Sequence, residues 1–168
     1  MMDLVLNHSS NEHRWFKEAK KSKDNPYHDY YIWRDGDEGV PPSDMKACFG
    51  GSAWEYVPEI GQYYFHQFLP EQPDLNWENP ALREEIYKMV NWWLDRGIAG
   101  FRIDAIINIK RPDLGRSSGG RAGRQRLFNQ QHHPDAEARR RDEKWHWRLF
   151  KRIKGTLLCA PRCVYGRR

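Results

Sequence analysis

The chain has 168 residues, a net charge of +5, 39% hydrophobic and 14% aromatic residues, and a mean hydropathy of −0.96. This length fits one ordinary domain, and the apolar content is enough for a packed core, so the composition excludes a globally disordered chain. No apolar run approaches the roughly 18 residues of a membrane-spanning helix. The Met-Met-Asp start, without a basic and then apolar segment, predicts no secretory leader.

The cysteines favour a reducing compartment. Cys48, Cys159 and Cys163 are an odd number without a framework spacing, whereas disulfide-built domains pair their cysteines. With the scattered histidines they give no convincing zinc set either, because structural zinc needs four grouped ligands. We therefore expect a cytoplasmic protein with no membrane partner, no metal and no other cofactor.

Charge is divided unevenly along the chain. Residues 1–110 hold 12 Lys and Arg against 18 Asp and Glu, a net charge of −6, and residues 111–168 hold 16 against 5, a net charge of +11. A strongly basic segment is typical of a nucleic-acid-binding arm. It also arises when two parts of a chain were never selected together.

The first 110 residues alternate between strand and helix patterns. Met2–Leu6 is a short apolar run that predicts a buried strand, and a polar run follows it. Trp15, Phe16 and Ala19 have helical spacing in a Lys- and Glu-rich background, which predicts a helix that begins near Ser10.

The stretch Asp24–Asn79 breaks this pattern. Pro, Gly and Asn recur among short aromatic runs, such as Tyr30–Trp33 and Tyr63–Phe65. About 55 residues are too many for a plain loop, so we expect a small inserted subdomain with a few short strands. Its aromatic side chains form either a platform for a sugar ring or the core of the insertion, and core is the default for most of them.

A second helix opens at Asn79-Pro80, with Asn as the cap and Pro at the first helical position, and Gly97 ends it. The next apolar run, Ile98–Ile103, predicts a strand that ends at Asp104. One face of the helix, about 100° wide, is apolar. It comprises Leu82, Ile86, Met89, Val90, Trp93 and Leu94.

Strand, excursion, helix and strand make a βαβ unit, which predicts a right-handed crossover and a parallel sheet. Asn7 and His8 follow the first strand, and Asp104 ends the second. The carboxyl ends of parallel strands lie at one edge of the sheet, and in a β/α barrel that edge is the catalytic face. The pattern predicts an α/β fold with these residues at that edge.

Asp104 and Arg102 are the residues best suited to chemistry. Side chains two apart on a strand share a face, so Arg102 is placed to hold the Asp104 carboxylate ionised and oriented, with a lowered pKa. An ionised carboxylate in a walled pocket suits the nucleophile of a retaining glycosidase. From spacing alone, a structural Arg–Asp pair at a strand end is the more common arrangement.

His8, five residues after Asp3, is placed to donate a hydrogen bond to a sugar hydroxyl. A lone His after a strand is more often a structural turn residue. The triplet Asn7-His8-Ser9 also matches a glycosylation sequon, which we discount in a chain without a secretory leader.

Three motifs resemble a known family. Asp3–His8 (Asp-Leu-Val-Leu-Asn-His) followed by Ser-Ser-Asn-Glu-His is similar to the first signature of the α-amylase family, and Gly100–Asp104 (Gly-Phe-Arg-Ile-Asp) resembles its second. Between them, Gln72–Asn79 (Gln-Pro-Asp-Leu-Asn-Trp-Glu-Asn) is similar to the insertion motif of the oligo-1,6-glucosidase and α-glucosidase branch. The likeness runs through residues 2–110.

The resemblance implies a partial (β/α)8 TIM barrel with an inserted B domain after the third strand. Residues 1–8 would be that strand, 9–78 the B domain, and 79–110 the third helix and fourth strand. Residues 111–168 would be a basic tail outside the family pattern.

The resemblance also implies roles. Asp104 would be the catalytic nucleophile, forming a β-glucosyl ester, and Arg102 would orient it. The pocket for the terminal glucose would be formed by Asp3, His8, Phe68 and Gln72, with Asp3 acting partly through its neighbours. Calcium ligands of this branch lie upstream of the matched region, so no metal is assigned. Ala105 stands where α-1,6-specific relatives usually carry Val and α-1,4-specific ones often Thr, which leaves the linkage preference open.

The resemblance places the acid/base Glu after a fifth strand and an Asn-His-Asp signature after a seventh, and this chain contains neither, nor the first two strands. We therefore expect an inactive fragment. Three functions for the whole enzyme remain: a retaining α-glucosidase hydrolysing terminal α-1,6 or α-1,4 bonds of short isomalto- or malto-oligosaccharides, a glucosyl-transferring isomerase (trehalose-synthase-like or isomaltulose-synthase-like), and a non-catalytic barrel-like partner subunit. Asp104 and Arg102 argue against the third.

The tail after Lys110 has three interpretations: a nucleic-acid-binding arm, a disordered extension, or a shift of reading frame. Back-translating Trp145–Arg168 and reading one base later permits a helix-like face and then an apolar strand. That order is similar to the family segment before the acid/base Glu. We favour the frameshift, and expect no nucleic-acid partner and a disordered tail.

Overall fold

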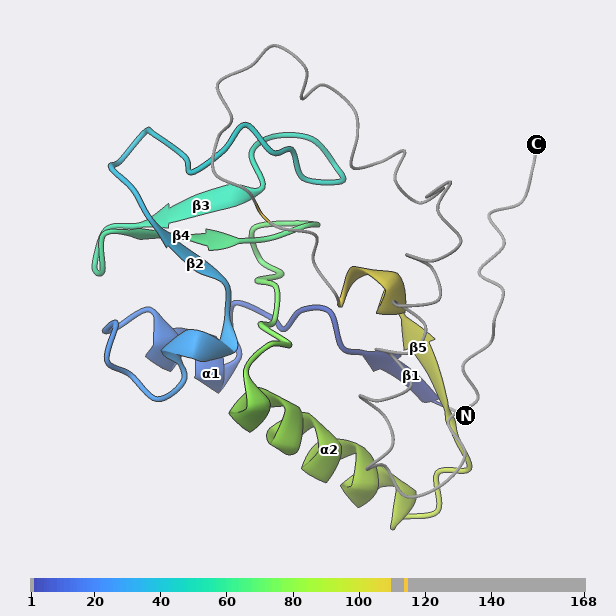
Figure 1. Ribbon diagram of the computed structural model, residues 1–168. Coiled ribbons are helices and arrows are strands. Elements are labelled where there is room, and N and C mark those ends of the chain that lie inside the picture. Colours follow the sequence, from blue (N-terminus) through green and yellow to red (C-terminus); the bar gives the residue numbers. More distant parts are fainter. Residues whose placement is uncertain (1, 110–113, 115–168) are drawn as a thin grey trace, which may run out of the picture.

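The computed structural model describes residues 2–109 and residue 114, and Figure 1 shows their arrangement. The basic tail predicted for residues 111–168 thus lies outside the described residues, apart from Leu114. The elements in chain order are β1 (Met2–Val5), α1 (Arg14–Ala19), η1 (His28–Tyr30), β2 (Trp33–Asp35), β3 (Trp54–Val57), β4 (Gln62–Phe65), α2 (Pro80–Leu94), β5 (Phe101–Asp104) and η2 (Ile106–Asn108).

The strands β1 and β5 pair in parallel, as predicted for a βαβ unit. Their register places Asp3 opposite Arg102 and Val5 opposite Asp104. β1 is one residue shorter than the predicted strand. The described residues contain this two-stranded sheet and a separate three-stranded sheet, and therefore no closed barrel.

The insertion between β1 and α2 contains a three-stranded antiparallel sheet in the order β2-β4-β3, which confirms the expectation of a few short strands. The first aromatic run, 30–33, is not a strand throughout. Tyr30 and Tyr31 donate backbone hydrogen bonds to Tyr27 and His28 at 3.1 and 3.2 Å. These turn-type bonds keep Tyr30 in η1, so β2 begins only at Trp33.

The two ends of the insertion lie side by side. The backbone N–H of Ser9 donates to Pro73 O at 3.1 Å, and that of Asn11 donates to Glu71 O at 2.8 Å. An isolated bridge also pairs His8 with Asp74. The chain therefore leaves the end of β1 and returns to it at the same place.

The helix α1 starts at Arg14, four residues later than predicted. The Ser10 hydroxyl accepts a hydrogen bond from the Glu12 N–H at 3.0 Å, and the His13 N–H donates to Ser10 O at 3.0 Å. These bonds close a turn that competes with helix. The ring of His13 then caps the helix by accepting from the Trp15 N–H at 3.2 Å.

The helix α2 begins where the sequence predicts. Asn79 Oδ1 accepts from the N–H groups of Ala81 and Leu82 at 2.8 and 3.4 Å, which satisfies two donors of the first turn. Buried residues lie on one side of the helix, as expected for an amphipathic helix. They are Leu82, Ile86, Tyr87 and Val90.

The strand β5 starts at Phe101, three residues later than predicted. The Ile98 N–H donates to Trp93 O at 3.3 Å, so Ile98 closes the end of α2 and takes no part in the sheet. Gly97 makes this closure possible because its φ of +86° lies in the left-handed region.

Most aromatic side chains of the insertion belong to a core, as expected, and do not form a platform for a sugar ring. Tyr31, Trp33 and Tyr64 share one buried cluster with Leu4 of β1 and Val90 of α2. A second, smaller cluster lies within the insertion and comprises Ala47, Ala53, Trp54, Tyr63 and Phe65. The main core therefore joins the insertion to the barrel strands.

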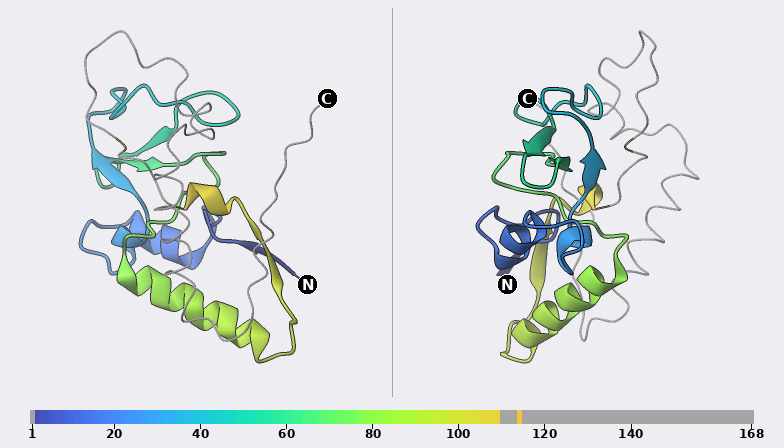
Figure 2. Two further views of the ribbon diagram at one scale, coloured as in Figure 1. Left: turned by 45° about the vertical axis from the view of Figure 1, so that its right-hand side comes forward. Right: turned by 90° about the vertical axis from the view of Figure 1, so that its left-hand side faces the viewer.

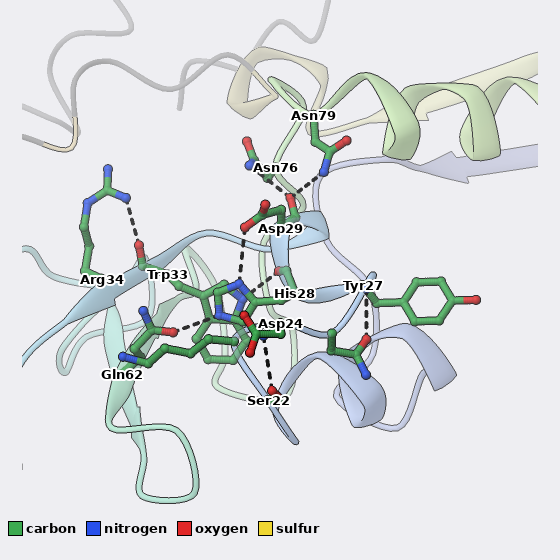
Figure 3. Close-up of polar contacts among 12 residues, drawn as sticks. Ser22, Asp24, Tyr27, His28, Asp29, Trp33, Arg34, Gln62, Asn76 and Asn79 are labelled. Carbon is green, nitrogen blue, oxygen red and sulfur yellow. Dashed lines mark hydrogen bonds and ion pairs between the residues drawn. The ribbon is translucent and has the colours of Figure 1, made fainter.

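Polar contacts fasten the insertion to the start of α2 (Figure 3). The side-chain amides of Asn76 and Asn79 both donate to the backbone carbonyl of Asp29 at 3.1 Å. Next to it, His28 Nε2 donates to Gln62 Oε1 of β4 at 2.8 Å. η1 is thus held between the three-stranded sheet and the cap of α2.

We predict that Leu82→Ala destabilises the chain strongly. Leu82 is fully buried, and replacing a buried Leu by Ala costs about 2–5 kcal/mol because of lost burial and the cavity left behind. Urea unfolding followed by circular dichroism should show this loss. If the unaltered chain is stabilised by less than this amount, the variant should show no unfolding transition. The control is Lys88→Ala, at an exposed ion pair with Glu85, which should change the free energy by less than about 1 kcal/mol. Equal losses in both variants would contradict the placement of Leu82.

Candidate active site

The β1–β5 pair has one apolar and one polar face. Leu4 and Phe101 are buried in the cluster that includes α2. Asp3 and Val5 on β1, with Arg102 and Asp104 on β5, alternate with them and are exposed. In a β/α barrel the helices cover the outside, so the polar face corresponds to the barrel interior.

Arg102 makes its closest contacts with Asp3. Its Nε donates to Asp3 Oδ1 at 2.8 Å and its Nη2 to Asp3 Oδ2 at 2.5 Å. Arg102 Nη1 lies 3.9 Å from Asp104 Oδ1. The ion pair predicted between Arg102 and Asp104 is therefore present at this longer distance, and Asp3, which the register places directly opposite Arg102, is a second and closer partner that was not predicted for it. Arg102 lies between the two carboxylates and grips one of them bidentately.

The paired guanidinium acts on the ionisation of Asp3. Its hydrogen bonds hold the pKa of the Asp3 carboxyl below the usual value, since they favour the charged form. Both side chains are half exposed, so solvent screens the attraction. Asp3 and Arg102 therefore form an ionised, oriented pair next to Asp104.

Three predicted pocket residues come together at the end of β1, although Phe68 and Gln72 belong to the far side of the insertion. The ring centroids of His8 and Phe68 lie 5.4 Å apart at 63°. His8 Nε2 lies 2.9 Å from Gln72 Nε2, and His8 Nδ1 lies 3.2 Å from Asn7 Nδ2. A neutral imidazole has one acceptor nitrogen, so at most one of the two amides donates to it.

Asp74 and Asn7 hold this cluster in place, although no role in the pocket was predicted for either. Asn7 Nδ2 and the Gln67 N–H both donate to Asp74 Oδ1 at 3.2 Å. Asn7 and Asp74 are almost completely buried, so Asn7 is shielded from glycosylation. The signal in the sequence was an acidic residue directly between two apolar ones, Pro73 and Leu75.

Phe49 is a third residue of the site for which no role was predicted. Its ring centroid lies 6.2 Å from that of Phe68, and Phe49 is 72% exposed. Gly50 and Gly51 follow it with φ of +94° and +76°, which turns the chain sharply and leaves Phe49 at the tip. Phe49 thereby extends the aromatic wall that Phe68 begins.

The candidate nucleophile, Asp104, and the candidate pocket residues lie at the ends of two adjoining strands. Asp104 pairs with Val5, three residues before His8. Ala105, directly after Asp104, has a left-handed backbone with φ +50°, and η2 follows. Gln67 Nε2 donates to Asn108 Oδ1 of η2 at 3.3 Å, which joins the insertion to the segment after Asp104.

The described residues also contain a cavity and a free cysteine besides the predicted site residues. A cavity of about 440 Å³ is lined by residues that include Trp33, Gln62 and Asn76, and none of the predicted site residues lines it. Within residues 2–109 no group of three or more His, Cys, Asp and Glu could hold a metal. Cys48 is an exposed free thiol, whereas the other two cysteines lie outside the described range. No helix in that range is long and apolar enough to cross a membrane.

Comparison with known proteins accounts for this arrangement. The family model described as the catalytic domain of α-amylase matches residues 1–149, and the chain belongs to this family. The oligo-1,6-glucosidase of Halalkalibacterium halodurans is 59% identical over 113 residues, which cover 67% of this chain and 20% of that enzyme. The chain thus spans about a fifth of the length of the curated relatives it matches.

Solved structures show the same likeness. The trehalose-6-phosphate hydrolase of Bacillus licheniformis superimposes with a TM-score of 0.64 at 50% identity, over 69% of this chain and 22% of that one. A trehalulose synthase mutant in complex with Tris gives a TM-score of 0.64 at 53% identity, over 67% of this chain and 20% of that one. Relatives of this chain therefore include enzymes named as hydrolases and as a synthase.

We predict that Arg102→Gln raises the pKa of Asp3 toward its ordinary value, because the lowered pKa arises mainly from the hydrogen bonds with Arg102. With Arg102 in place, Asp3 contributes stability that is present above its unfolded pKa of about 3.9 and is lost as the pH falls through the lower folded value. The variant should lose this acid-side dependence. Carbon-13 carboxyl NMR titration of the 168-residue chain measures the shift.

Arg96→Gln is the matched control. Arg96 lies over the Trp92 ring, 3.3 Å from its centroid, and its Nη1 donates to Trp92 O at 3.1 Å. Its replacement should leave the Asp3 titration unchanged. An unchanged Asp3 pKa in Arg102→Gln would show that the bidentate pair does not form in solution.

Proposed function

We propose that residues 2–109 supply the glucose pocket and the nucleophile of a retaining α-glucosidase. The whole enzyme would hydrolyse terminal α-1,6 or α-1,4 bonds of short oligosaccharides. The observation that carries this proposal is the meeting of two groups at adjoining strand ends. One is the carboxylate pair around Arg102, and the other is the cluster of His8, Phe68 and Gln72.

Each residue has a role in a two-step displacement. The Asp104 carboxylate attacks the anomeric carbon, the glycosidic C–O bond breaks, and the leaving oxygen takes a proton from a general acid. In the second step the same residue acts as a base and takes a proton from water, which attacks the anomeric carbon and releases the Asp104 carboxylate. Arg102 holds positive charge beside Asp104 while Asp3 fixes the plane of its guanidinium. We place the general acid outside residues 2–109.

Pocket residues would bind the terminal glucose. The His8 ring and the Gln72 amide offer hydrogen-bond donors and acceptors for hydroxyl groups, and the flat ring of Phe68 offers an apolar surface to a sugar face. Asp74 and Asn7 are buried behind them, so they act on the pocket through its geometry.

A glucosyl-transferring isomerase is the second candidate, and the likeness to a trehalulose synthase favours it. Both reactions use the same glucosyl ester, which is passed to water in one case and to a sugar hydroxyl in the other. The products formed from sucrose, maltose and isomaltose separate them, since glucose release marks hydrolysis and a new disaccharide marks transfer. A non-catalytic partner subunit is the third candidate, and a preserved Asp104 beside Arg102 speaks against it.

The test uses a full-length chimera, in which residues 2–109 of this chain replace the matching segment of the oligo-1,6-glucosidase from Halalkalibacterium halodurans. We expect hydrolysis of isomaltose, and a loss of about a thousandfold or more in kcat for Asp104→Asn, because the nucleophile is removed. Asp95→Asn is the control, at the exposed end of α2, and should retain full activity. A loss below about tenfold in Asp104→Asn would contradict the role of Asp104.

We predict that the 168-residue chain alone does not hydrolyse isomaltose. A carboxylate nucleophile needs a proton donor for the leaving oxygen, and a parallel sheet of two strands leaves both outer edges unpaired. Turnover is measured by glucose release, and a thermal melt checks that the chain is folded. Turnover well above the buffer rate would overturn the expectation of an inactive fragment.

A further inference from the structure

The side chain of Gln67 joins two parts of the candidate site that are far apart in the sequence. Its Nε2 donates a hydrogen bond to Asn108 Oδ1 at 3.3 Å. Gln67 follows β4 in the insertion, and Asn108 ends η2, the turn after Asp104. Figures 1 and 2 show η2 between the three-stranded sheet and the β1–β5 pair.

The backbone of Gln67 is held on both sides. Its N–H donates to Asp74 Oδ1 at 3.2 Å, and its carbonyl accepts from the Cys48 N–H at 2.7 Å. Its side-chain amide also reaches Cys48 Sγ at 3.7 Å. The next residue, Phe68, packs against His8. Gln67 is therefore a fixed point of the pocket wall, and its amide is directed at η2.

The other end of the link has a strained backbone. Ala105 has φ +50° and ψ +27°, a region that residues other than Gly adopt rarely and that persists where the surroundings hold it. Within the turn, the Asn108 N–H donates to Ala105 O at 2.9 Å and the Ile109 N–H to Ile106 O at 3.3 Å. Gln67 adds an anchor from outside the turn.

We propose that Gln67 is a positioning residue for the nucleophile. Its carboxamide holds the turn after Asp104 at a set distance from the wall that carries Phe68. The catalytic consequence rests on the proposed function, whereas the coupling between wall and turn rests on the geometry alone. A displacement of about 1 Å in a reacting group lowers a rate by about a hundredfold, so one such link is enough to affect attack by Asp104.

The first experiment follows amide hydrogen exchange of the 168-residue chain by NMR. Gln67→Leu removes the donor and keeps a similar volume, and should speed exchange of the Asn108 and Ile109 amides about fivefold, the effect of losing one hydrogen bond. Asn108→Ala should speed exchange at Ile109 equally. Gln67→Glu should restore slow exchange, because the amide of Asn108 rotates and donates to the new carboxylate.

Gln62→Leu is the control, since it removes a carboxamide from the same insertion. Gln62 contacts His28 and Asp35 and should leave exchange at Asn108 and Ile109 within twofold of the unaltered chain. The coupling is overturned if Gln67→Leu has no effect at these amides, if Gln62→Leu has the same effect, or if the unaltered chain shows no protection there.

The second experiment measures kinetics in the full-length chimera. Gln67→Leu should lower kcat for isomaltose at least tenfold while the inhibition constant of glucose stays within twofold, and Gln67→Glu should recover most of kcat. A merely structural role would lower the melting temperature and leave kcat of the folded enzyme unchanged, and this result would overturn the proposal. A chimera without any activity would instead overturn the proposed function, and the exchange experiment would still decide the coupling.

Discussion

A buried carboxylate organises the candidate site. Asp74 accepts hydrogen bonds from the side chain of Asn7 and from the backbone of Gln67, and it has almost no contact with solvent. Breaking a hydrogen bond in a protein interior leaves a costly unpaired group. Through this one side chain, the end of β1 and the wall of the insertion have a defined separation. His8 directly follows Asn7 and Phe68 directly follows Gln67, so the same contacts set the separation of His8 and Phe68.

A second constraint comes from the pairing of β1 with β5. The register sets Asp3 opposite Arg102, and the guanidinium is held there by both carboxylate oxygens. Asp104 then lies next to a cation whose orientation is already determined by another residue. A Lys in its place would carry the same charge without the planar fork. Orientation, more than charge, is what the pair contributes.

Local patterns predicted some of these features and not others. The cap of α2 at Asn79 and its apolar face depend on neighbours in the sequence, and the structure confirms both. Spacing along β5 predicted the ion pair of Arg102 with Asp104, whereas the closer pair with Asp3 depends on a strand register between residues 99 positions apart and was not predicted. The helix α1 starts later than predicted because the Ser10 hydroxyl competes locally for a backbone donor. Phe49 and Gln67 belong to no motif, and only the folding of the insertion brings them to the site.

The insertion leaves and rejoins β1 at a single point, where Ser9 and Asn11 bond to Pro73 and Glu71. The entropy of closing a loop grows only with the logarithm of its length, so exposed stretches between these bonds, such as residues 37–41, can change in length at small cost. Gln72 lies between the two bonded residues Glu71 and Pro73, and His8 directly precedes Ser9. Both belong to the part that such changes leave untouched. The fold thus separates exposed stretches, whose length evolution can vary, from a part that must hold its geometry, which includes Gln67, Phe68 and the residues around the two bonds. Insertions and deletions in the first can change the outer surface of the insertion without rebuilding the second.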